Sequence, residues 1–393
     1  MIPLKTLYSY ILVLGFAALL PAQIESIIVN RNHLTYIDGV IERAIEKEDI
    51  PGAAIIVADT KNIYYRKAFG HCQLVPNRQK MQLDMLFDMA SVTKPVATAT
   101  SVMILVERGD LRLTDRVSDY VDSFSRYIAK DSSMSSEARI YHLLNHTSGL
   151  PAYTNAETAA KVLGTPASRK AIVDYLARLP KLSAPGDKYR YSCLGYITLG
   201  YIVEKISGLT LQEFSQKNIF EPLNMENTTF IPSDSLRSLC VPTELVDGKP
   251  LRGVVHDPLA RLQGGISGNA GLFSTVDDLS TFVRMLMNGG TLSDIRIISP
   301  LSIARMSETL SNIPNLRYGY GWVVKKGISW VGGDLFPDGG FGHTGYTGTS
   351  VWIDPSTELY VVLLCNRVHP EDDGSVSWLR SSIANIVAGA VCF

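Results

Sequence analysis

Ser91 and Lys94 form the only SxxK pattern in the chain, at the start of a stretch with helical periodicity. Residues three apart share one face of a helix, so the Lys94 ammonium can approach the Ser91 hydroxyl. A serine becomes a good nucleophile when a base removes its proton, and a lysine that is desolvated or close to another cation can be that base. The first helical turn also presents the Ser91 N–H to a developing oxyanion. Serine is also a common N-cap residue, so the pair alone leaves a structural role open.

Tyr191-Ser192-Cys193 opens an apolar stretch with helical spacing, and Pro185-Gly186 precedes it. A tyrosine next to Lys94 can ionise, because a neighbouring positive charge favours the phenolate, and the phenolate can act as a general base. A tyrosine at a helix entrance also has an ordinary packing role. The residues by themselves leave both interpretations open.

His343-Thr344-Gly345-Tyr346 lies in a glycine-rich stretch that leads into a strand-like run. Glycines let a substrate backbone lie close to a strand edge, and the Tyr346 N–H can supply a second oxyanion donor. His343 would place a titratable positive charge at a cleft. As a lone feature, the stretch is equally typical of a hairpin that carries a surface histidine.

The elements that must position these residues are predicted by the apolar periodicity. Helical spacing predicts helices over 31–47, from Ser91 to just before Gly109, and over 168–179, 193–207, 210–217, 276–288, 299–309 and 379–390. Short apolar runs between turn residues predict strands over 53–58, 63–68, 320–325, 349–353 and 359–365. Strands near both ends, with helices between them, predict an α/β (α+β) protein in which both termini build one sheet. We expect a sheet domain of residues 23–115 and 311–393 with an inserted helical domain of residues 116–310.

Composition limits the class of protein and its partners. The chain has 393 residues, of which 46% are hydrophobic and 19% charged, and this suits a globular protein rather than a disordered one. Lys plus Arg (37) nearly balances Asp plus Glu (38), so we expect no nucleic-acid partner. The five cysteines are scattered and form no CxxC pair, which argues against a disulfide scaffold. Neither cysteine pairing nor oligomeric state can be inferred from the sequence.

Residues 1–22 have the layout of a secretory signal peptide, with Lys5, an apolar run from Ile11 to Leu20, and Pro21-Ala22. We expect cleavage after Ala22 and a periplasmic or secreted protein. A lipid anchor is not expected, because no cysteine follows the apolar run. An uncleaved membrane anchor is the alternative, which the short run disfavours because a span needs ~20 residues. The mature chain should therefore have no stable membrane span.

The SxxK pattern at Ser91, the Tyr191 motif and His343-Thr344-Gly345, in this order, resemble the serine β-lactamase and penicillin-binding protein superfamily. The resemblance is to its class C-like branch, which includes D,D-carboxypeptidases and esterases, and covers nearly the whole mature chain. It implies an antiparallel sheet of about five strands flanked by helices, with a cleft between the sheet and the helical region. It implies no metal and no organic cofactor.

The resemblance also implies catalytic roles. Ser91 matches the acylated nucleophile, Lys94 the group that shuttles its proton, and Tyr191 the general base. The backbone N–H groups of Ser91 and Tyr346 match the oxyanion hole.

The residues expected to bind substrate are His343, Thr344, Gly345, Tyr346 and Cys193. Two of them, Cys193 and His343, depart from the family pattern. Cys193 stands where many relatives have an asparagine whose amide bonds a substrate amide, so amide recognition and tight β-lactam binding are less certain than the fold suggests. His343 stands where many relatives have lysine. An unperturbed imidazole titrates near ~6.5, so we expect a partial charge on His343 near neutral pH and an activity that depends on it.

These features predict a secreted serine hydrolase that forms an acyl-enzyme at Ser91 and acts as a D,D-carboxypeptidase on peptidoglycan peptides ending in D-Ala, with β-lactams as further ligands. The alternatives are an esterase or weak β-lactamase, and, from another class, a penicillin-binding sensor that deacylates slowly.

Metal-dependent hydrolysis is disfavoured: His142 and His146 are four apart, as zinc ligands on a helix can be, but position 143 is leucine rather than the required glutamate. An α/β-hydrolase is disfavoured because no GxSxG elbow occurs.

Overall fold

The computed structural model describes residues 28–130, 134–309, 313–314, 316–327 and 332–392. The expected signal peptide, residues 1–22, lies outside the described residues. Among the helices of the described part, none has both the length and the apolar character needed to cross a bilayer.

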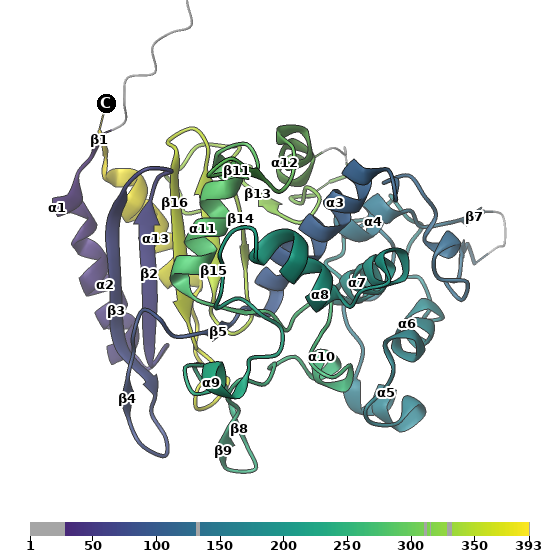
Figure 1. Cartoon of the computed structure of the whole chain (residues 1–393), viewed down its shortest axis with the longest axis horizontal. Helices are drawn as coiled ribbons and strands as arrows, with labels where there is room; N and C mark the ends of the chain where they lie inside the picture. Colours follow the sequence, from purple (N-terminus) through teal and green to yellow (C-terminus); the bar gives the residue numbers. More distant parts are fainter. Residues whose placement is uncertain (1–27, 131–133, 310–312, 315, 328–331, 393) are drawn as a thin grey trace, which may run out of the picture.

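An antiparallel sheet built from both ends of the chain forms the left half of the molecule in Figure 1. Seven strands of the described residues form it, all antiparallel to their neighbours, in the order β13-β14-β15-β16-β2-β3-β4. Their bounds are β13 Val323–Val324, β14 Phe341–Thr344, β15 Ser350–Asp354, β16 Leu359–Cys365, β2 Gly52–Ala58, β3 Ile63–Gln73 and β4 Gln79–Lys80. The pairing of β16 with β2 joins the two termini, as the distribution of strands predicts.

The expected count of about five strands needs correction, although the fold class is confirmed. Each of the five predicted strands is present, and the two missed ones are β4 and β14. β4 has only two residues, both exposed, so it carries no alternating pattern. β14 is the start of the glycine-rich stretch and contains Gly342, where a Cβ would lie 2.7 Å from the Trp352 side chain of β15.

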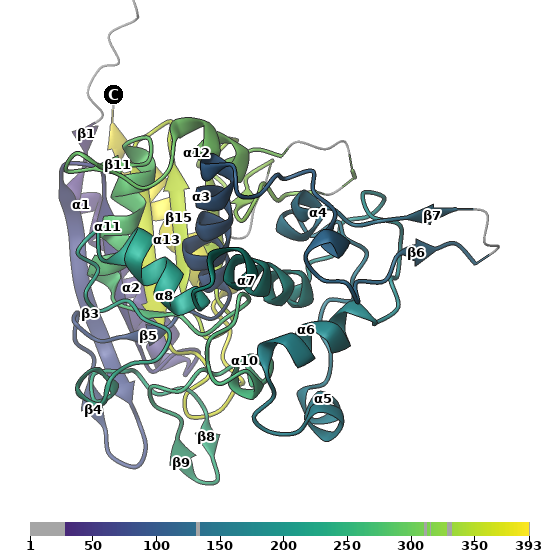
Figure 2. The ribbon, with the colours of Figure 1, turned by 45° about the vertical axis from the view of Figure 1, so that its right-hand side comes forward.

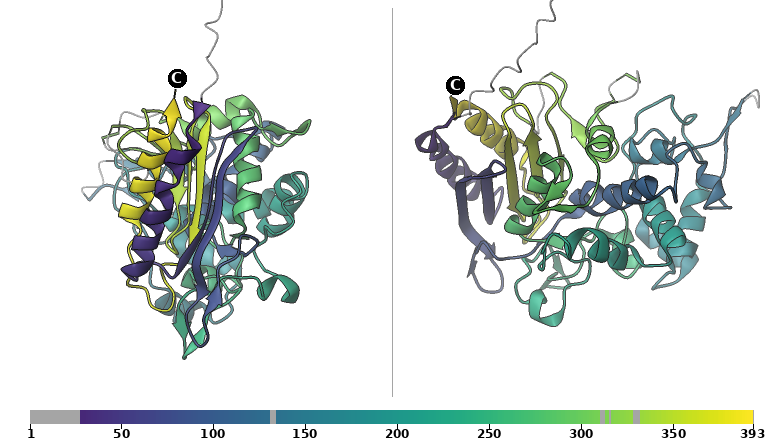
Figure 3. Two further views of the ribbon diagram at one scale, coloured as in Figure 1. Left: turned by 90° about the vertical axis from the view of Figure 1, so that its left-hand side faces the viewer. Right: turned by 45° about the horizontal axis from the view of Figure 1, so that its top comes forward.

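Helices cover both faces of the sheet. Helices α1 (Arg31–Leu34), α2 (Tyr36–Glu46) and α13 (Ser377–Gly389) pack on one face, and α11 (Val276–Met287) packs on β2 and β16 from the other (Figure 3, left). Every residue of β2 is buried, and alternate side chains enter the two cores. This is why β2 is a continuous apolar run in the sequence.

Nine further α-helices belong to the described residues, and α4, α5 and α6 among them lie beside the sheet in the right half of Figure 2. They are α3 Thr100–Arg108, α4 Ile140–Leu144, α5 Ala156–Leu163, α6 Arg169–Ala177, α7 Cys193–Ser207, α8 Leu211–Ser215, α9 Asp234–Arg237, α10 Pro258–Leu262 and α12 Pro300–Ser307. The predicted helix 193–207 coincides with α7, because the Ser192 hydroxyl caps its first turn and Gly208 ends it in a left-handed conformation. The expected division into a sheet domain and a helical domain stays a prediction. Helix α11, which belongs to the expected helical domain, packs on the sheet.

Short two-stranded pairings complete the fold. They join β1 (Ile28–Val29) to β17 (Val391–Cys392), β5 (Phe87–Asp88) to β10 (Phe273–Ser274), β6 (Tyr127–Ile128) to β7 (Ser135–Ser136), β8 (Leu245–Val246) to β9 (Lys249–Pro250), and β11 (Thr291–Leu292) to β12 (Ile295–Arg296). The β5–β10 pair matters for the site, because it fixes the segment just before Ser91.

Candidate active site

Ser91 and Lys94 lie against each other in the segment that runs into α3. Residues Ala90–Val92 form a single 3₁₀ turn, and the Lys94 Nζ lies 2.9 Å from Ser91 Oγ. The Lys94 ammonium also donates to the Asn269 carbonyl at 2.9 Å. Lys94 is 0% exposed, whereas Ser91 lines a cavity. The structure therefore places an alcohol and a buried amine within hydrogen-bond distance.

Asp88, which belongs to none of the predicted motifs, holds this turn. Ala90 has a φ of +45°, a left-handed conformation that costs energy in a residue with a Cβ. Asp88 Oδ1 accepts a hydrogen bond from the Ala90 N–H at 2.8 Å, and Oδ2 accepts one from the His256 N–H at 2.6 Å. Burial raises the pKa of the Asp88 carboxyl, and these two N–H donors oppose that rise. A lone charge in the apolar run 86–90 is the signal that could have identified this residue.

Tyr191 reaches the pair from the segment before α7. The Lys94 Nζ lies 5.1 Å from the centre of the Tyr191 ring, and the Tyr191 hydroxyl faces Lys94 and Ser91. His146 packs on the same ring with a centroid distance of 4.4 Å, and its Nδ1 accepts from the Ser192 N–H at 3.1 Å. His146, considered from the sequence only as a metal ligand, is thus a packing partner of Tyr191.

Burial and neighbouring charge set the protonation of this pair. Burial raises the pKa of Tyr191, against the opposing effect of the Lys94 ammonium. Burial disfavours the Lys94 ammonium too, but electrostatic attraction from the Cys193 and Tyr191 side chains outweighs it and raises the pKa of Lys94. Neither direction agrees with the expectation of a lysine with a lowered pKa or a tyrosine that ionises readily. The pair must lose one proton before it can accept the proton of Ser91.

The turn after β14 is attached to the segment that carries the serine. Thr347 Oγ1 donates to the Asp88 carbonyl at 2.8 Å, and Thr349 Oγ1 donates to the Met89 carbonyl at 3.1 Å. A Cβ on Gly345 would lie 2.1 Å from Thr349 Oγ1 and 2.5 Å from the Met89 carbonyl oxygen. Only glycine permits this close approach, which explains one glycine of the predicted motif.

His343 is buried on β14, with 2% of its surface exposed. Its Nδ1 lies 2.9 Å from the Thr344 carbonyl oxygen, which can only accept, so Nδ1 carries the proton and Nε2 is left as an acceptor. Burial, followed by repulsion from the Lys94 ammonium, lowers the pKa of His343 to about 3. The expectation of a partial positive charge near neutral pH is therefore wrong, because the sequence does not reveal that this position is buried.

This depressed pKa predicts a loss of stability in acid. The unfolded chain binds a proton at His343 below pH ~6.5, whereas the folded chain does not until about pH 3, so the free energy of unfolding should fall as the pH drops through this interval. The expected contribution is about 1.4 kcal/mol per pH unit. Urea unfolding at pH 7, 6, 5 and 4 should show a shallower decline for His343→Gln than for wild type, with the surface variant His33→Gln as control. Parallel declines in wild type and His343→Gln would contradict the prediction.

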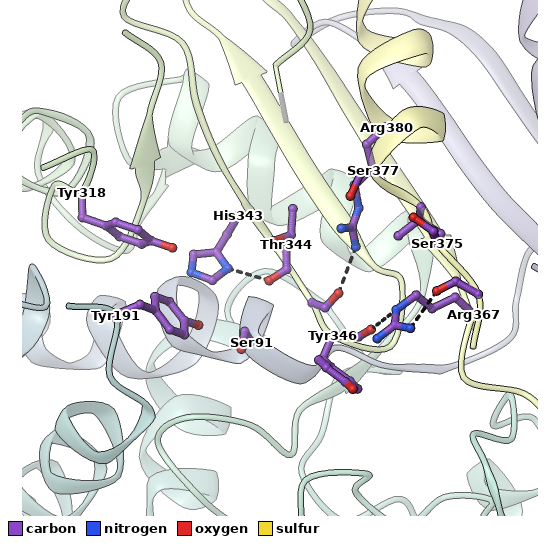
Figure 4. Close-up of a pocket in the computed structure, with 13 residues that line it drawn as sticks. Ser91, Tyr191, Tyr318, His343, Thr344, Tyr346, Arg367, Ser375, Ser377 and Arg380 are labelled. Atoms are coloured by element: carbon purple, nitrogen blue, oxygen red, sulfur yellow. Dashed lines mark hydrogen bonds between the residues drawn. The ribbon is translucent and has the colours of Figure 1, made fainter. Parts of the chain in front are cut away.

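Two cavities meet at Ser91. One, of about 370 Å³, is lined by Ser91, Tyr191, Tyr318, His343, Thr344, Gly345, Tyr346, Arg367, Arg380 and residues 374–377 (Figure 4). The other, of about 340 Å³, has Cys193 in its wall together with Ala90, Ser91, Tyr153, Tyr191, His256, Asp257, Pro258, Ala270 and Tyr346. All the predicted site residues thus lie around one point of the molecule, although their roles remain predictions. Arg367, Arg380 and Tyr153 were not anticipated.

The two histidines weighed as zinc ligands serve other contacts. His142 Nδ1 accepts from the Arg139 N–H at 3.0 Å, and His142 Nε2 would lie 3.3 Å from a Cβ on Gly186. His146 faces the aromatic rings described above. Across the described ranges, no group of three or more His, Cys, Asp or Glu side chains is arranged to hold a metal ion.

The family model described as "Beta-lactamase" matches residues 37–385, which is well over half of the chain. The chain belongs to the Beta-lactamase family. The resemblance inferred from the SxxK, tyrosine and HTG motifs is thereby confirmed. The protein is an enzyme, a hydrolase of the Beta-lactamase family.

The names of proteins similar to this Beta-lactamase family protein describe several activities. It is 29% identical over 373 residues to an "N-acetylmuramyl-L-alanine amidase" of Bacillus subtilis (strain 168), covering 87% of this chain and 84% of that protein. It is 29% identical over 363 residues to a "Putative D-alanyl-D-alanine carboxypeptidase" of Salmonella typhimurium, covering 85% and 82%. Among solved structures, "EstCE1, a hydrolase with promiscuous acyltransferase activity" superposes with a TM-score of 0.75 at 24% identity, covering 91% of this chain and 99% of that one. The last comparison supports the fold alone.

Proposed function

We propose that this hydrolase forms a covalent acyl-enzyme at Ser91 and acts as a D,D-carboxypeptidase on peptidoglycan peptides that end in D-Ala. The observation that carries the proposal is the 2.9 Å contact between Lys94 Nζ and Ser91 Oγ beneath the Tyr191 hydroxyl. Once the Lys94–Tyr191 pair has lost a proton, it can accept the Ser91 proton as Oγ forms a bond to the substrate carbonyl carbon.

The later steps use the same groups. The N–H groups of Ser91 and Tyr346 would hold the tetrahedral oxyanion. When the C–N bond breaks, the Lys94–Tyr191 pair returns its proton to the departing amine of D-Ala. A water molecule then attacks the ester carbon and gives a proton to the same pair. The C–Oγ bond breaks, the pair returns the proton to Ser91 Oγ, and the acid leaves.

The wall of the larger cavity supports a leaving group with a free carboxylate. Arg367 and Arg380 line it together with Thr344, Ser375 and Ser377, and the Arg367 guanidinium is ion-paired with Asp372 at 2.7 Å. Guanidinium and hydroxyl donors are suited to carboxylate recognition. The carboxypeptidase name of the Salmonella relative agrees with this leaving group.

An esterase is the second candidate, and Cys193 favours it. Cys193 replaces the amide donor of many relatives, and the smaller cavity beside it has apolar walls at Ala90, Pro258 and Ala270. An ester substrate needs no amide recognition at this position.

Location is part of the proposal. The apolar run of residues 11–20 supports export by a cleaved signal peptide, which would bring the enzyme to the periplasm or the exterior, where peptidoglycan peptides lie.

Intact-mass spectrometry tests the proposal. The purified mature protein is mixed with benzylpenicillin, with a D-Ala-D-Ala peptide or with a short aryl ester, and sampled over time; Ser91→Ala is the control. We expect adducts that Ser91→Ala cannot form, with D-Ala released from the peptide. A penicillin adduct that persists, without release of D-Ala, would indicate a sensor, and turnover of the ester alone would indicate an esterase. Equal reaction of Ser91→Ala would overturn the acyl-enzyme.

A further inference from the structure

Arg380 reaches from α13 to the turn that carries the Tyr346 N–H. Its Nη2 donates to the Gly345 carbonyl and to the Thr349 carbonyl, at 2.9 Å each. Figure 4 shows the guanidinium extending from the helix to this turn, with Ser91 between Tyr191 and Tyr346 in the view. The contact therefore joins the helix that covers the outer face of the sheet to the expected oxyanion hole.

The other carbonyls of this turn are held as well. The Tyr346 carbonyl accepts from Arg367 Nε at 2.7 Å, and the Thr347 carbonyl accepts from the Arg367 N–H at 2.9 Å. The Gly348 carbonyl accepts from Cys365 Sγ at 3.2 Å. All five carbonyls from position 345 to position 349 thus have donors, so the peptide planes of the turn are fixed one by one.

The orientation of one of these planes decides where the Tyr346 N–H points. In a trans peptide the C=O of one residue and the N–H of the next point in opposite directions. Because the Gly345 carbonyl points toward Arg380 and accepts its hydrogen bond, the Tyr346 N–H points away from α13. A Cβ on Gly345 would lie 2.5 Å from the Met89 carbonyl oxygen and 3.3 Å from the Ala90 Cβ, so the turn lies close to the segment just before the serine. Among the described residues, no group accepts a hydrogen bond from this N–H.

Arg380 also brings a charge. It is 8% exposed, and although burial lowers the pKa of Arg380 to about 10, the guanidinium stays protonated at neutral pH. A cation that bonds to a carbonyl in a water-poor environment polarises the whole amide and makes its N–H a stronger donor.

We propose that Arg380 is a positioning residue of the oxyanion hole, which aims and polarises the Tyr346 N–H through the Gly345–Tyr346 peptide. The inference rests on the proposed acyl-enzyme mechanism, because it concerns the donor to the developing oxyanion. It predicts that Arg380 lowers the barrier to acylation even for a substrate that has no carboxylate to bind.

The test uses an uncharged aryl acetate and an alkyl boronic acid, which forms a tetrahedral adduct on a nucleophilic serine. Arg380→Met is expected to lower kcat for the ester roughly 10–100-fold with KM little changed, since removal of an oxyanion donor costs about 10²–10³ and here the donor is only misaligned. Affinity for the boronic acid should fall by the same factor. Arg380→Lys, which keeps the cation, should recover part of both losses. Ser381→Ala, on the same helix but outside the two cavities, is the matched control for changes in α13.

Each outcome decides the question. An unchanged kcat in folded Arg380→Met, or a change in KM alone, would overturn the inference. If Arg380→Met does not fold, Arg380→Lys and Arg380→Gln take its place, and kcat should fall in the order Arg, Lys, Gln; equal rates would overturn the inference. Wild type that shows no reaction dependent on Ser91 would instead overturn the proposed function.

Discussion

Replacing Lys94 with methionine is expected to lower kcat/KM by about 10³–10⁴-fold while changing the stability of the protein by no more than about 1 kcal/mol. The activity falls because Lys94 is the only amine within hydrogen-bond distance of Ser91 Oγ among the described residues, and a positioned proton acceptor contributes about 10²–10⁴ to the rate. The activity against the aryl ester and the acylation rate with penicillin should fall together. Lys325→Met, which removes another buried lysine outside the two cavities, is the matched control for the loss of a buried charge.

The stability change is expected to be small because two opposing effects disappear with the charge. A fully buried ammonium is costly to desolvate, but its attraction to neighbouring groups outweighs that cost and raises the pKa of Lys94. Methionine has a similar length and keeps the packing, while the Asn269 carbonyl loses a donor. We expect the free energy of unfolding, measured in urea at pH 7, to stay within about 1 kcal/mol of that of wild type. A variant that is both inactive and several kcal/mol less stable would show that Lys94 is needed for packing rather than for chemistry.

Tyr191→Phe should lower kcat/KM by about 10²–10³-fold and leave the fold unchanged. The variant keeps the ring contacts with His146 and Lys94 and removes only the hydroxyl that faces Ser91. The expected loss is that of one general acid–base group. Tyr189→Phe removes a hydroxyl two residues earlier, where the ring stacks on Tyr318, and is the matched control.

The pH dependence of wild type and Tyr191→Phe gives a second readout. Since the pKa of Lys94 and the pKa of Tyr191 are both raised, the form that has lost one proton is scarce at neutral pH. The kcat/KM of wild type should therefore rise with pH, approaching tenfold per unit below the apparent pKa of the pair. Tyr191→Phe should change the position of this rise, because one of two coupled groups is gone. A profile identical to that of wild type would contradict a role for the Tyr191 hydroxyl in proton transfer.

The fold was largely predictable because its main elements carry strong local signals. β2 and β16 are continuous apolar runs, and α7 lies between a serine cap and a terminal glycine. β4 and β14 were missed because they are short and gain their pairing from neighbours rather than from their own sequence. The regular helix expected directly after Ser91 is instead a 3₁₀ turn followed by a wider π-helical segment, Lys94–Ala99, before α3 begins; Pro95 there lacks an N–H donor.

The sequence predicted which residues form the site, but not which of them carry a proton. Motif order was enough to place Ser91, Lys94, Tyr191 and the turn after β14 together. The charge of His343 could not be inferred, because burial decides it and the burial is produced by segments distant in sequence. Asp88 and Arg380 act on backbone groups, which no side-chain motif encodes, although Arg380 has the helical spacing of the buried positions Ile383 and Val387.

The pairing of β16 with β2 has a consequence for how the chain reaches this state. β2 is buried on both faces and lies between β3 and β16, so the sheet lacks a central neighbour until residues 359–365 have been synthesised. At about 5–20 residues per second, that interval lasts on the order of tens of seconds. Throughout it, one edge of an apolar strand is unpaired and open to other chains. The nascent protein is therefore most vulnerable to aggregation late in translation, and its folding should be slow because its central contact is also one of its longest in sequence.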